Sequence, residues 1–369
     1  MAEVIFVAGE ASGDLHAAGV AAELRRRRPD LDLAGFGGPL MEEAGVQLFA
    51  RYETGVMGFL EVIRHIPMHL ALLNQIERRF AGGDVRLLVV IDYPGFNMKA
   101  AAAASEAGIP VLYYVTPQVW AWGEGRLPKL AKIVTKAAVI LPFEEKLLRG
   151  HGIDATFVGH PLLDRIGDLP SKQEARASLG LSDAAPVLAL FPGSREQEID
   201  RHIDDFVETA HEVERAIPGL QTIVSVAPTI SLDPSRCPFK LVHSASFTVL
   251  RAADAALCKS GTTTLESAIA DCPLVVAYRT SDISYFLARF LVTIPHIGLV
   301  NVVAGREVAK EFVQDDLVPR KVAAQLTRLL DSADAERTRV LDGLSEVRGK
   351  LGQPGAAARV AEMASELAG

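Results

Sequence analysis

The segment Val187–Ile199 reads VLALFPGSREQEI. Its first five residues form a short apolar run that is typical of a buried strand, and Pro192-Gly193 ends that run. We expect Ser194 to cap a following helix, with Gln197 three positions later completing a capping box. A strand that passes through a glycine turn into a helix N-terminus is a ready anion site, because the first helical N–H groups are unpaired. Arg195 could bind a phosphate there, although an ordinary turn with a solvated arginine explains the pattern equally well.

The same order of apolar strand, glycine turn and helix recurs in both halves of the chain. It predicts doubly wound α/β domains with parallel sheets, and 369 residues exceed one ordinary core. We therefore expect two Rossmann-like domains, residues 1–165 and 166–345, and a C-terminal helix in 346–369 that packs back on an N-terminal domain. The predicted strands are Val4–Val7, Leu31–Gly35, Leu87–Ile91, Val111–Val115, Val187–Phe191, Gln221–Val226, Lys240–Val242, Ala255–Cys258 and Leu274–Tyr278.

The composition excludes several classes of protein. Hydrophobic residues make up 49% of the chain and charged residues 23%, as in a globular protein. A net charge of −8, without a basic tract that alternates with aromatic residues, argues against nucleic-acid binding. Three scattered cysteines predict no zinc site or disulfide, and we expect no metal and no cofactor. No apolar run reaches the ~18–20 residues that span a bilayer, so we expect a cytoplasmic protein that can still lie on a membrane surface.

The first predicted strand is followed by the turn AGEASGDLH at Ala8–His16. Its glycines, Gly9 and Gly13, do not form the G-x-G-x-x-G fingerprint of dinucleotide binding. Ser12 and Asp14 are good helix-capping residues, and capping explains them without a ligand.

Asp92 follows the predicted strand Leu87–Ile91 directly. In open α/β sheets ligands gather beyond the carboxyl ends of the strands, so Asp92 is a candidate general base. The alternative is a turn or helix cap. Asn97, five positions later, is expected only to cap the next helix.

A second group of candidates lies in KSGTTTLESAIA, Lys259–Ala270. Thr263 and Glu266 fit a capping box, and Glu266 could also accept a hydrogen bond from a ribose while the loop amides touch phosphate. Farther on, Asn301 stands in an otherwise apolar run, where a buried amide needs partners.

The stretch Thr54–Ile76 leaves little polar face. A buried helix explains this best, and the alternative is a helix, broken near Pro67, that exposes apolar residues to lipid or acyl chains. Taken together, two domains with glycine turns that point into a shared cleft, a carboxylate and a diphosphate site resemble the outline of a nucleotide-sugar-dependent glycosyl transfer.

Nine motifs resemble the lipid-A-disaccharide synthase family, in the family's order and over nearly the whole chain. They are VAGEASGDLH at Val7–His16, MGFLEVI at Met57–Ile63, IDYPGFN at Ile91–Asn97, YVTPQVWAW at Tyr114–Trp122, LPFE at Leu141–Glu144, FVGHPLLD at Phe157–Asp164, PGSREQEI at Pro192–Ile199, SGTTTLE at Ser260–Glu266 and NVVAGREV at Asn301–Val308. The resemblance implies a glycosyltransferase-B fold. It also implies a metal-independent, inverting transfer from UDP-2,3-diacylglucosamine to 2,3-diacylglucosamine 1-phosphate (lipid X), giving lipid A disaccharide 1-phosphate and UDP.

The resemblance also implies roles for single residues. Asp92 matches the family's general base, Arg195 its diphosphate-binding arginine, and Asn301 an essential asparagine. Residues that match the substrate and UDP sites are Gly9, Ser12, Gly13, Asp14, Gly193, Ser194, Ser260, Gly261, Thr262 and Glu266. Expected acyl contacts are Val56, Met57, Phe59 and Leu60. Gly95 departs from the pattern, because some relatives carry a second acid there.

The expected partners are the two lipid substrates and the cytoplasmic face of the inner membrane, where the protein would bind peripherally. A homodimer is possible through exchange of the last helix. The alternatives are another enzyme of the same fold, namely a UDP-sugar 2-epimerase or a transferase for soluble acceptors, and a UDP-sugar-binding protein without activity.

Overall fold

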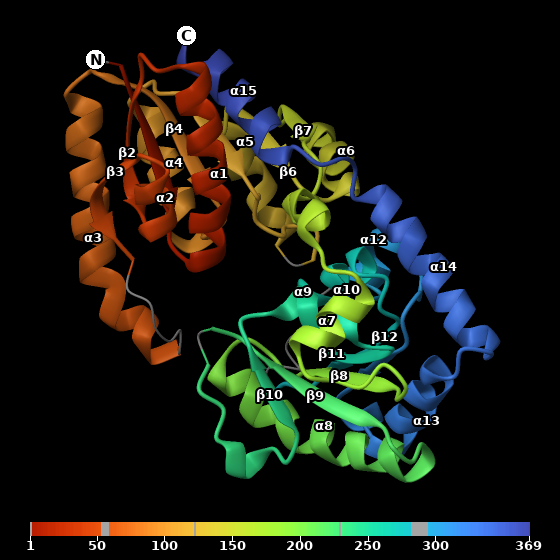
Figure 1. Ribbon diagram of the computed structural model, residues 1–369. Coiled ribbons are helices and arrows are strands. Elements are labelled where there is room, and N and C mark those ends of the chain that lie inside the picture. Colours follow the sequence, from red (N-terminus) through yellow and green to blue (C-terminus); the bar gives the residue numbers. More distant parts are fainter. Residues whose placement is uncertain (1, 53–58, 122, 229, 282–293) are drawn as a thin grey trace. The chain divides into compact units, whose positions relative to one another are not determined.

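The computed structural model describes residues 2–52, 59–121, 123–228, 230–281 and 294–369. The chain divides into two compact units (Figure 1). Unit 1 comprises Met1–Asp164 and Gly352–Gly369, and unit 2 comprises Arg165–Leu351. The prediction of two doubly wound α/β domains is confirmed, and each unit is described by itself below.

Unit 1 contains a seven-stranded sheet in the order β3-β2-β1-β4-β5-β6-β7, and all its strand pairs are parallel. Apart from Glu3 and Arg86 near the strand starts, its central strands β1, β4 and β5 are buried apolar runs, as expected for a parallel sheet covered by helices on both sides. The strands are β1 (Glu3–Ala8), β2 (Asp32–Gly37), β3 (Gln47–Arg51), β4 (Val85–Ile91), β5 (Val111–Tyr114), β6 (Lys136–Val139) and β7 (Ala155–Phe157).

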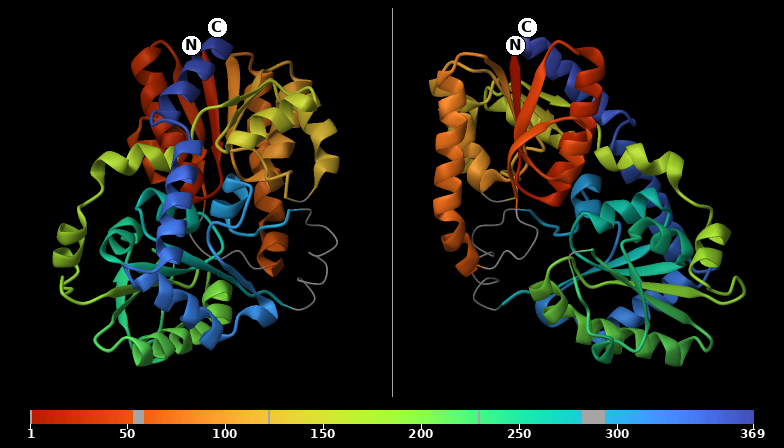
Figure 2. Two further views of the ribbon diagram at one scale, coloured as in Figure 1. Left: turned by 90° about the vertical axis from the view of Figure 1, so that its right-hand side faces the viewer. Right: turned by 60° about the vertical axis from the view of Figure 1, so that its left-hand side comes forward.

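Helices cover the two faces of this sheet (Figures 1 and 2). One face packs against α1 (Ala11–Arg27) and the C-terminal helix α15 (Ala356–Ala368), which lies beside α1. The other face packs against α3 (Phe59–Ala81), α4 (Pro94–Glu106) and α5 (Leu127–Ile133). Helix α3 is continuous through Pro67, so the break that the lipid-contact alternative places there is absent. The remaining helices are α2 (Pro39–Glu43), η1 (Glu124–Arg126), α6 (Pro142–Gly150) and η2 (Pro161–Asp168).

Unit 2 contains a six-stranded parallel sheet in the order β10-β9-β8-β11-β12-β13. The strands are β8 (Val187–Phe191), β9 (Gln221–Val226), β10 (Lys240–His243), β11 (Ala255–Lys259), β12 (Leu274–Tyr278) and β13 (Glu311–Val313).

Two long helices of unit 2, α8 (Glu196–Ala216) and α13 (Pro319–Leu330), pack against each other on one side of the sheet (Figure 1). On the other side lie α9 (Ser246–Ala252), α10 (Thr263–Ile269), α12 (Leu299–Ala304) and α14 (Ala335–Lys350), with α7 (Lys172–Ser178) against α9. Two single 3₁₀ turns, η3 (Pro234–Arg236) and η4 (Gln314–Asp316), complete the described elements.

The strand order reverses once in each sheet. In unit 1 the chain runs outward from β1 through β2 and β3 and then returns to the other side of β1 with β4. In unit 2 it runs outward from β8 through β9 and β10 and returns beside β8 with β11. In open α/β sheets ligands bind beyond the carboxyl ends of the strands at such a switch point. The β1–β4 and β8–β11 switch points are therefore where a site is expected.

Candidate active site

Asp92 lies at the β1–β4 switch point. Ala8 and Ile91 are the last residues of β1 and β4 and pair with each other, so Gly9 and Asp92 follow at the same edge of the sheet. Asp92 is half-buried, and its backbone adopts the left-handed conformation at φ 46°. Tyr93 follows at φ 48°. Two successive non-glycine residues in this region store strain that the surrounding structure must compensate.

Hydrogen bonds to backbone oxygens hold this strained corner. The buried Asn97 side chain donates through Nδ2 to the carbonyl oxygens of Asp92 at 2.7 Å and Ile91 at 3.0 Å. The Tyr113 hydroxyl donates to the Asp92 carbonyl oxygen at 2.9 Å. Asn97 is therefore not the helix cap that its position in the sequence indicated, since it lies inside α4 and fixes the corner that carries Asp92.

Gly9 makes room for an aromatic ring at the same corner. A Cβ atom at Gly9 would overlap the Tyr93 ring. The Tyr93 hydroxyl lies 2.7 Å from Nε2 of His69 on α3. At Gly13 a Cβ atom would meet Ala8 at 3.4 Å, an ordinary van der Waals contact. Of the two glycines, only Gly9 is required for the close packing next to Asp92.

Asp14 uses its carboxylate inside the protein. It is buried, and it accepts hydrogen bonds from the N–H groups of Gly38 at 2.9 Å and of Leu40 and Met41 at 3.1 Å each. These are amides at the start of α2, so Asp14 caps a neighbouring helix and ties it to α1. The Ser12 hydroxyl is exposed and donates to Oε1 of Glu10 at 2.8 Å.

Glu144 is a buried acid at this end of unit 1 that the sequence did not single out as a site residue. It follows β6 in α6, and its two oxygens accept from Nε1 of Trp120 and from the Leu141 N–H, both at 3.0 Å. Burial raises the pKa of Glu144 to about 7, although these hydrogen bonds oppose the shift. The Trp120 ring also stacks edge-on against Phe143, with ring centroids 5.2 Å apart. Glu144 therefore anchors the loop after β5.

In unit 2 the turn after β8 contains Gly193, Ser194 and Arg195. Helix α8 begins at Glu196, and the side chain of its N-cap residue, Arg195, makes no capping hydrogen bond. The predicted capping box of Ser194 and Gln197 is therefore wrong. The carboxylate that reaches back belongs to Glu198, whose Oε2 accepts from the Ser194 N–H at 3.0 Å. Gly193 is at φ 143° and leaves room for the Glu198 side chain.

Glu198 also joins this turn to the end of β11. Its Oε1 lies 2.7 Å from Nζ of Lys259 and 3.7 Å from Nη1 of the exposed Arg195. Sequence inspection missed the pairing with Lys259, since 61 positions separate the two charges. Because β8 and β11 are neighbours, the three charged groups gather at the β8–β11 switch point.

The turn after β11 contains Ser260, Gly261 and Thr262. The Ser260 hydroxyl donates to the Ile297 carbonyl at 2.7 Å. Helix α10 begins at Thr263, and its N-cap residue, Thr262, makes no side-chain capping hydrogen bond, so the predicted Thr263–Glu266 capping box does not form. Burial raises the pKa of Glu266, while hydrogen bonding from Ser246 and the charge of Arg165 oppose that shift.

Asn301 is buried in α12, and all its hydrogen-bonding groups are used within the protein. Its Oδ1 accepts from the N–H groups of Val308 at 2.8 Å and Ala309 at 2.9 Å. Its Nδ2 donates to the Ala309 oxygen and to Oε1 of Glu311, both at 2.7 Å. Glu311 in turn accepts from the Gly298 N–H at the start of α12. Asn301 therefore ties α12 to β13.

The acyl contacts predicted for Thr54–Ile76 can be followed only in part. Val56 and Met57 lie outside the described residues, and Phe59 and Leu60 open α3 without described side chains. In the described second half of α3, Leu72 and Ile76 are buried in the core, whereas Leu70 is exposed. Within the described residues no helix is long and apolar enough to cross a membrane, and no three His, Cys, Asp or Glu side chains are grouped to hold a metal ion.

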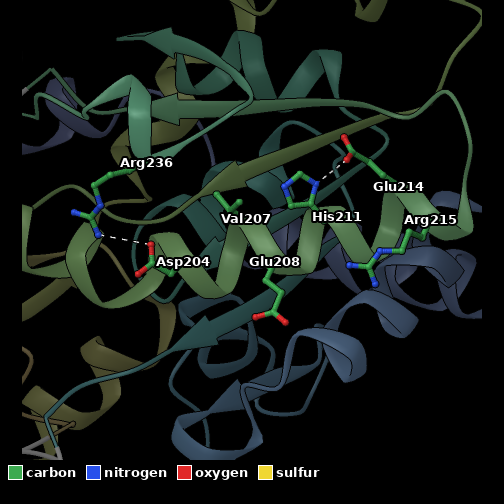
Figure 3. Close-up of a pocket in the computed structure, with 7 residues that line it drawn as sticks. All are labelled: Asp204, Val207, Glu208, His211, Glu214, Arg215 and Arg236. Atoms are coloured by element: carbon green, nitrogen blue, oxygen red, sulfur yellow. Dashed lines mark hydrogen bonds and ion pairs between the residues drawn. The ribbon is translucent and has the colours of Figure 1, made fainter.

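A pocket of about 570 Å³ lies elsewhere, along the exposed side of α8 (Figure 3). His211 pairs there with Glu214 at 3.0 Å. The pocket contains none of the candidate residues, and its three carboxylates outnumber its two arginines, which makes it unfavourable for a diphosphate. Its lining residues are Asp204, Val207, Glu208, His211, Glu214, Arg215 and Arg236.

Comparison with known proteins gives consistent results. The family model described as lipid-A-disaccharide synthetase matches residues 4–360. Proteins named lipid-A-disaccharide synthase are similar over nearly their whole length. The relative from Anaeromyxobacter dehalogenans (strain 2CP-1 / ATCC BAA-258) is 42% identical over 98% of this chain and 96% of its own, and the one from Myxococcus xanthus (strain DK1622) is 40% identical over 99% and 97%.

Solved structures show the fold at much lower identity. The calicheamicin glycosyltransferase CalG4 aligns with a TM-score of 0.63 at 16% identity, covering 100% of this chain and 98% of its own. A UDP-GlcNAc 2-epimerase from Neisseria meningitidis aligns with a TM-score of 0.63 at 11% identity, covering 99% of each chain. Both likenesses support a glycosyltransferase-B architecture and leave the choice of reaction to the family match.

Proposed function

The chain belongs to the lipid-A-disaccharide synthase family, and from that premise we propose how its two switch points serve one glycosyl transfer. It is a glycosyltransferase of lipid A biosynthesis that uses a UDP-sugar and a lipid acceptor. We propose UDP-2,3-diacylglucosamine as the donor and lipid X as the acceptor. The products are then lipid A disaccharide 1-phosphate and UDP.

We propose that Asp92 is the general base. The observation that supports this role is its position at the β1–β4 switch point, on a corner that Asn97 and Tyr113 hold by hydrogen bonds. A primary hydroxyl is a weak nucleophile at neutral pH, and a positioned base contributes about 10²–10⁴ in rate. Asp92 takes the proton of the acceptor 6-hydroxyl while that oxygen attacks the anomeric carbon. A single displacement of this kind inverts the configuration.

We propose that unit 2 binds the UDP. The turn Gly193–Arg195 receives the diphosphate, where Arg195 contributes positive charge to the departing phosphate. Residues Ser260–Thr262 line the adjacent turn and Glu266 accepts from the ribose hydroxyls, as the family resemblance implies. Asn301 acts as a positioning residue, because its polar atoms already hold α12 and β13 together. In unit 1, Gly9, Ser12, Gly13 and Asp14 shape the acceptor side.

We propose that the protein binds peripherally to the cytoplasmic face of the inner membrane. Two large apolar side chains, Leu15 near the start of α1 and Leu40 in the first turn of α2, are exposed at the same edge of unit 1 as Asp92. Acyl chains of the substrates fit such a surface. Changing Leu15 and Leu40 together with the expected acyl contacts Met57, Phe59 and Leu60 to polar residues should abolish flotation with lipid vesicles. Unchanged flotation would contradict this membrane contact.

A homodimer formed by exchange of α15 predicts twice the monomer mass by light scattering in detergent. The packing of α15 on α1 of the same chain predicts the monomer mass instead.

The main experiment measures UDP release from UDP-2,3-diacylglucosamine with and without lipid X, for the wild type and for Asp92→Asn. Acceptor-dependent release that falls at least ~10²-fold in the variant supports both the reaction and the base. Equal release by both proteins would leave the reaction and contradict the role of Asp92. No release by the wild type would contradict these substrates.

A further inference from the structure

Lys259 is a charged residue at the β8–β11 switch point without an assigned role. It is the last residue of β11, and only 18% of its side chain is exposed. Its Nζ lies 2.7 Å from Oε1 of Glu198 and 5.8 Å from the centroid of the Tyr278 ring. A Cβ atom at Gly261 would lie 3.9 Å from this Nζ. The ammonium group therefore lies between the turns that follow β8 and β11.

Glu198 occupies the position in the turn after β8 that suits an anion. The Glu198 Oε2 accepts from the Ser194 N–H. A Cβ atom added at Gly193 would lie 2.6 Å from the Cβ atom of Glu198. Burial raises the pKa of Glu198, but Lys259, the Ser194 N–H and Arg195 outweigh that effect and lower it. The carboxylate is thus ionised at neutral pH and is the internal anion of this turn.

The sum of charges shows what Lys259 adds. Among the described residues that pair at this turn, a diphosphate meets the carboxylate of Glu198 and the cations of Arg195 and Lys259. The sum of these three charges is positive with Lys259 and zero without it. Charges this close together, in a partly buried site, interact more strongly than in bulk water. Without Lys259 the diphosphate would meet only Arg195 and Glu198, whose opposite charges cancel.

We propose that Lys259 is a diphosphate-binding residue, which Glu198 holds at the switch point until the nucleotide arrives. The proposal rests on the proposed function of unit 2. When the bond from the anomeric carbon to the β-phosphate oxygen breaks, its electron pair goes to that oxygen, and the Lys259 ammonium stabilises the charge. The new bond forms to the acceptor 6-oxygen, whose proton goes to Asp92, and Lys259 keeps its own proton.

The test compares the binding of UDP and uridine by isothermal titration calorimetry, because only UDP carries the diphosphate. Lys259→Met should weaken UDP binding about tenfold and leave uridine binding unchanged. Lys259→Arg should restore most of the UDP affinity, since it keeps the charge. Lys310→Met removes an exposed lysine of the same unit and is the matched control, with both affinities unchanged.

Other results would overturn the proposal. Unchanged UDP binding in Lys259→Met, or an equal loss for UDP and uridine, would show a purely structural ion pair. If Lys259→Met does not fold, Glu198→Gln is compared with Glu198→Gln/Lys259→Met, which leaves no unpaired buried carboxylate. A roughly tenfold difference in UDP affinity between these two supports the proposal, and equal affinities contradict it.

The wild type and Arg195→Ala separate this inference from the proposed function. If the wild type binds UDP no more tightly than uridine, the proposed diphosphate site fails and the role of Lys259 fails with it. If Arg195→Ala loses the preference for UDP while Lys259→Met keeps it, only the role of Lys259 is contradicted.

Discussion

At the β1–β4 switch point the carboxylate residue is held through its backbone, whereas at the β8–β11 switch point the carboxylate itself is held by cations. Asp92 stands on a left-handed corner, and amide and hydroxyl groups of Asn97 and Tyr113 bind its carbonyl oxygen. Glu198 has its side chain between Lys259 and Arg195. The neutral hydrogen bonds hold the backbone of Asp92 in one position, whereas the ion pairs keep the Glu198 carboxylate ionised and in place.

The difference matches the two tasks of a glycosyl transfer. A general base must stand within hydrogen-bonding reach of one proton, so its position decides the rate. A diphosphate site must attract and hold two or more negative charges, so its electrostatics decide the affinity. Substitutions that disturb the Asp92 corner of unit 1 should therefore change turnover. Substitutions of the charged residues at the β8–β11 switch point should change nucleotide binding and its dependence on salt.

Asn97→Ala gives the largest expected effect. It removes the donor to the Ile91 and Asp92 carbonyls, so the strained corner can relax and move the Asp92 carboxylate. A displacement of about 1 Å costs roughly 10²-fold in rate. We expect kcat to fall by about that factor while UDP affinity stays unchanged, measured by UDP release and calorimetry.

The matched control for this prediction is Asn74→Ala, which removes an exposed asparagine of α3 in the same unit. It should leave kcat unchanged. A wild-type kcat in folded Asn97→Ala would show that the backbone corner does not position the base.

Asn301→Ala tests the corresponding buried asparagine of unit 2. Removing it leaves the N–H groups of Val308 and Ala309 without their acceptor and breaks the link to Glu311. Orphaned buried donors cost roughly 1–3 kcal/mol each, so we expect a loss of about 3 kcal/mol in the free energy of unfolding. Urea unfolding measures it.

If Asn301→Ala keeps its stability but loses turnover, Asn301 contacts substrate, and its role is catalytic and not positional.

The two buried asparagines also show how far a sequence can be interpreted. The sequence predicts a helix cap at Asn97 and a buried amide in need of partners at Asn301, and only the second prediction is close to the observed role. The partners of both are mainly backbone groups, which have no signature in the sequence. Hydrogen bonds of this kind become visible only when the packing is known.

The strands were easier to predict than the sites. Val187–Phe191 and Leu274–Tyr278 match β8 and β12 at both ends, because each is an apolar run that turn residues bound. The edge strands β3 and β13 were missed, since QLFAR and EFV are short and only partly buried. Edge strands lack the continuous apolar run of central strands.

Capping at the turns was mispredicted for a related reason. Ser194 and Gln197 have the spacing of a capping box, but α8 begins at Glu196 and Glu198 reaches back instead. The spacing rule assumes a known helix start, and a shift of one or two residues changes the partner. The pair of Glu198 and Lys259 depends on β8 and β11 being neighbours, which local spacing does not reveal.

Glu144→Gln tests unit 1 through pH. The pKa of the Glu144 carboxyl is about 7 in the folded chain, against 4.5 as its ordinary value. Between these values the folded state keeps a proton that the unfolded state has lost, so stability falls as pH rises. The contribution is complete below about pH 4.5 and is lost as the pH rises through about 7, a change of roughly 3 kcal/mol.

Urea unfolding of the wild type and Glu144→Gln at pH 5 and pH 8 measures this difference. The wild type should lose stability relative to the variant as the pH rises. The introduced amide offers one acceptor oxygen to the two donors, Trp120 and Leu141, so the variant should be less stable than the wild type at both pH 5 and pH 8. Only the change in stability between the two pH values therefore reports the titration of the carboxyl group. Equal changes in both proteins would contradict the raised pKa.

Arg195→Ala has the smallest expected effect and tests unit 2 through salt. We expect UDP affinity to fall about tenfold, which is what one charge-assisted contact contributes. The Arg195 side chain is 66% exposed, so added salt should screen its interaction and reduce the difference in UDP affinity between variant and wild type.

Arg215→Ala is the matched control, because Arg215 lies at the other end of α8 and is 65% exposed. Calorimetry at low and high salt should show no effect of Arg215→Ala. If the difference in UDP affinity between Arg195→Ala and the wild type does not change with salt, the arginine acts through packing. The β8–β11 switch point would then not bind the diphosphate through charge, and the contrast with the β1–β4 switch point would fail.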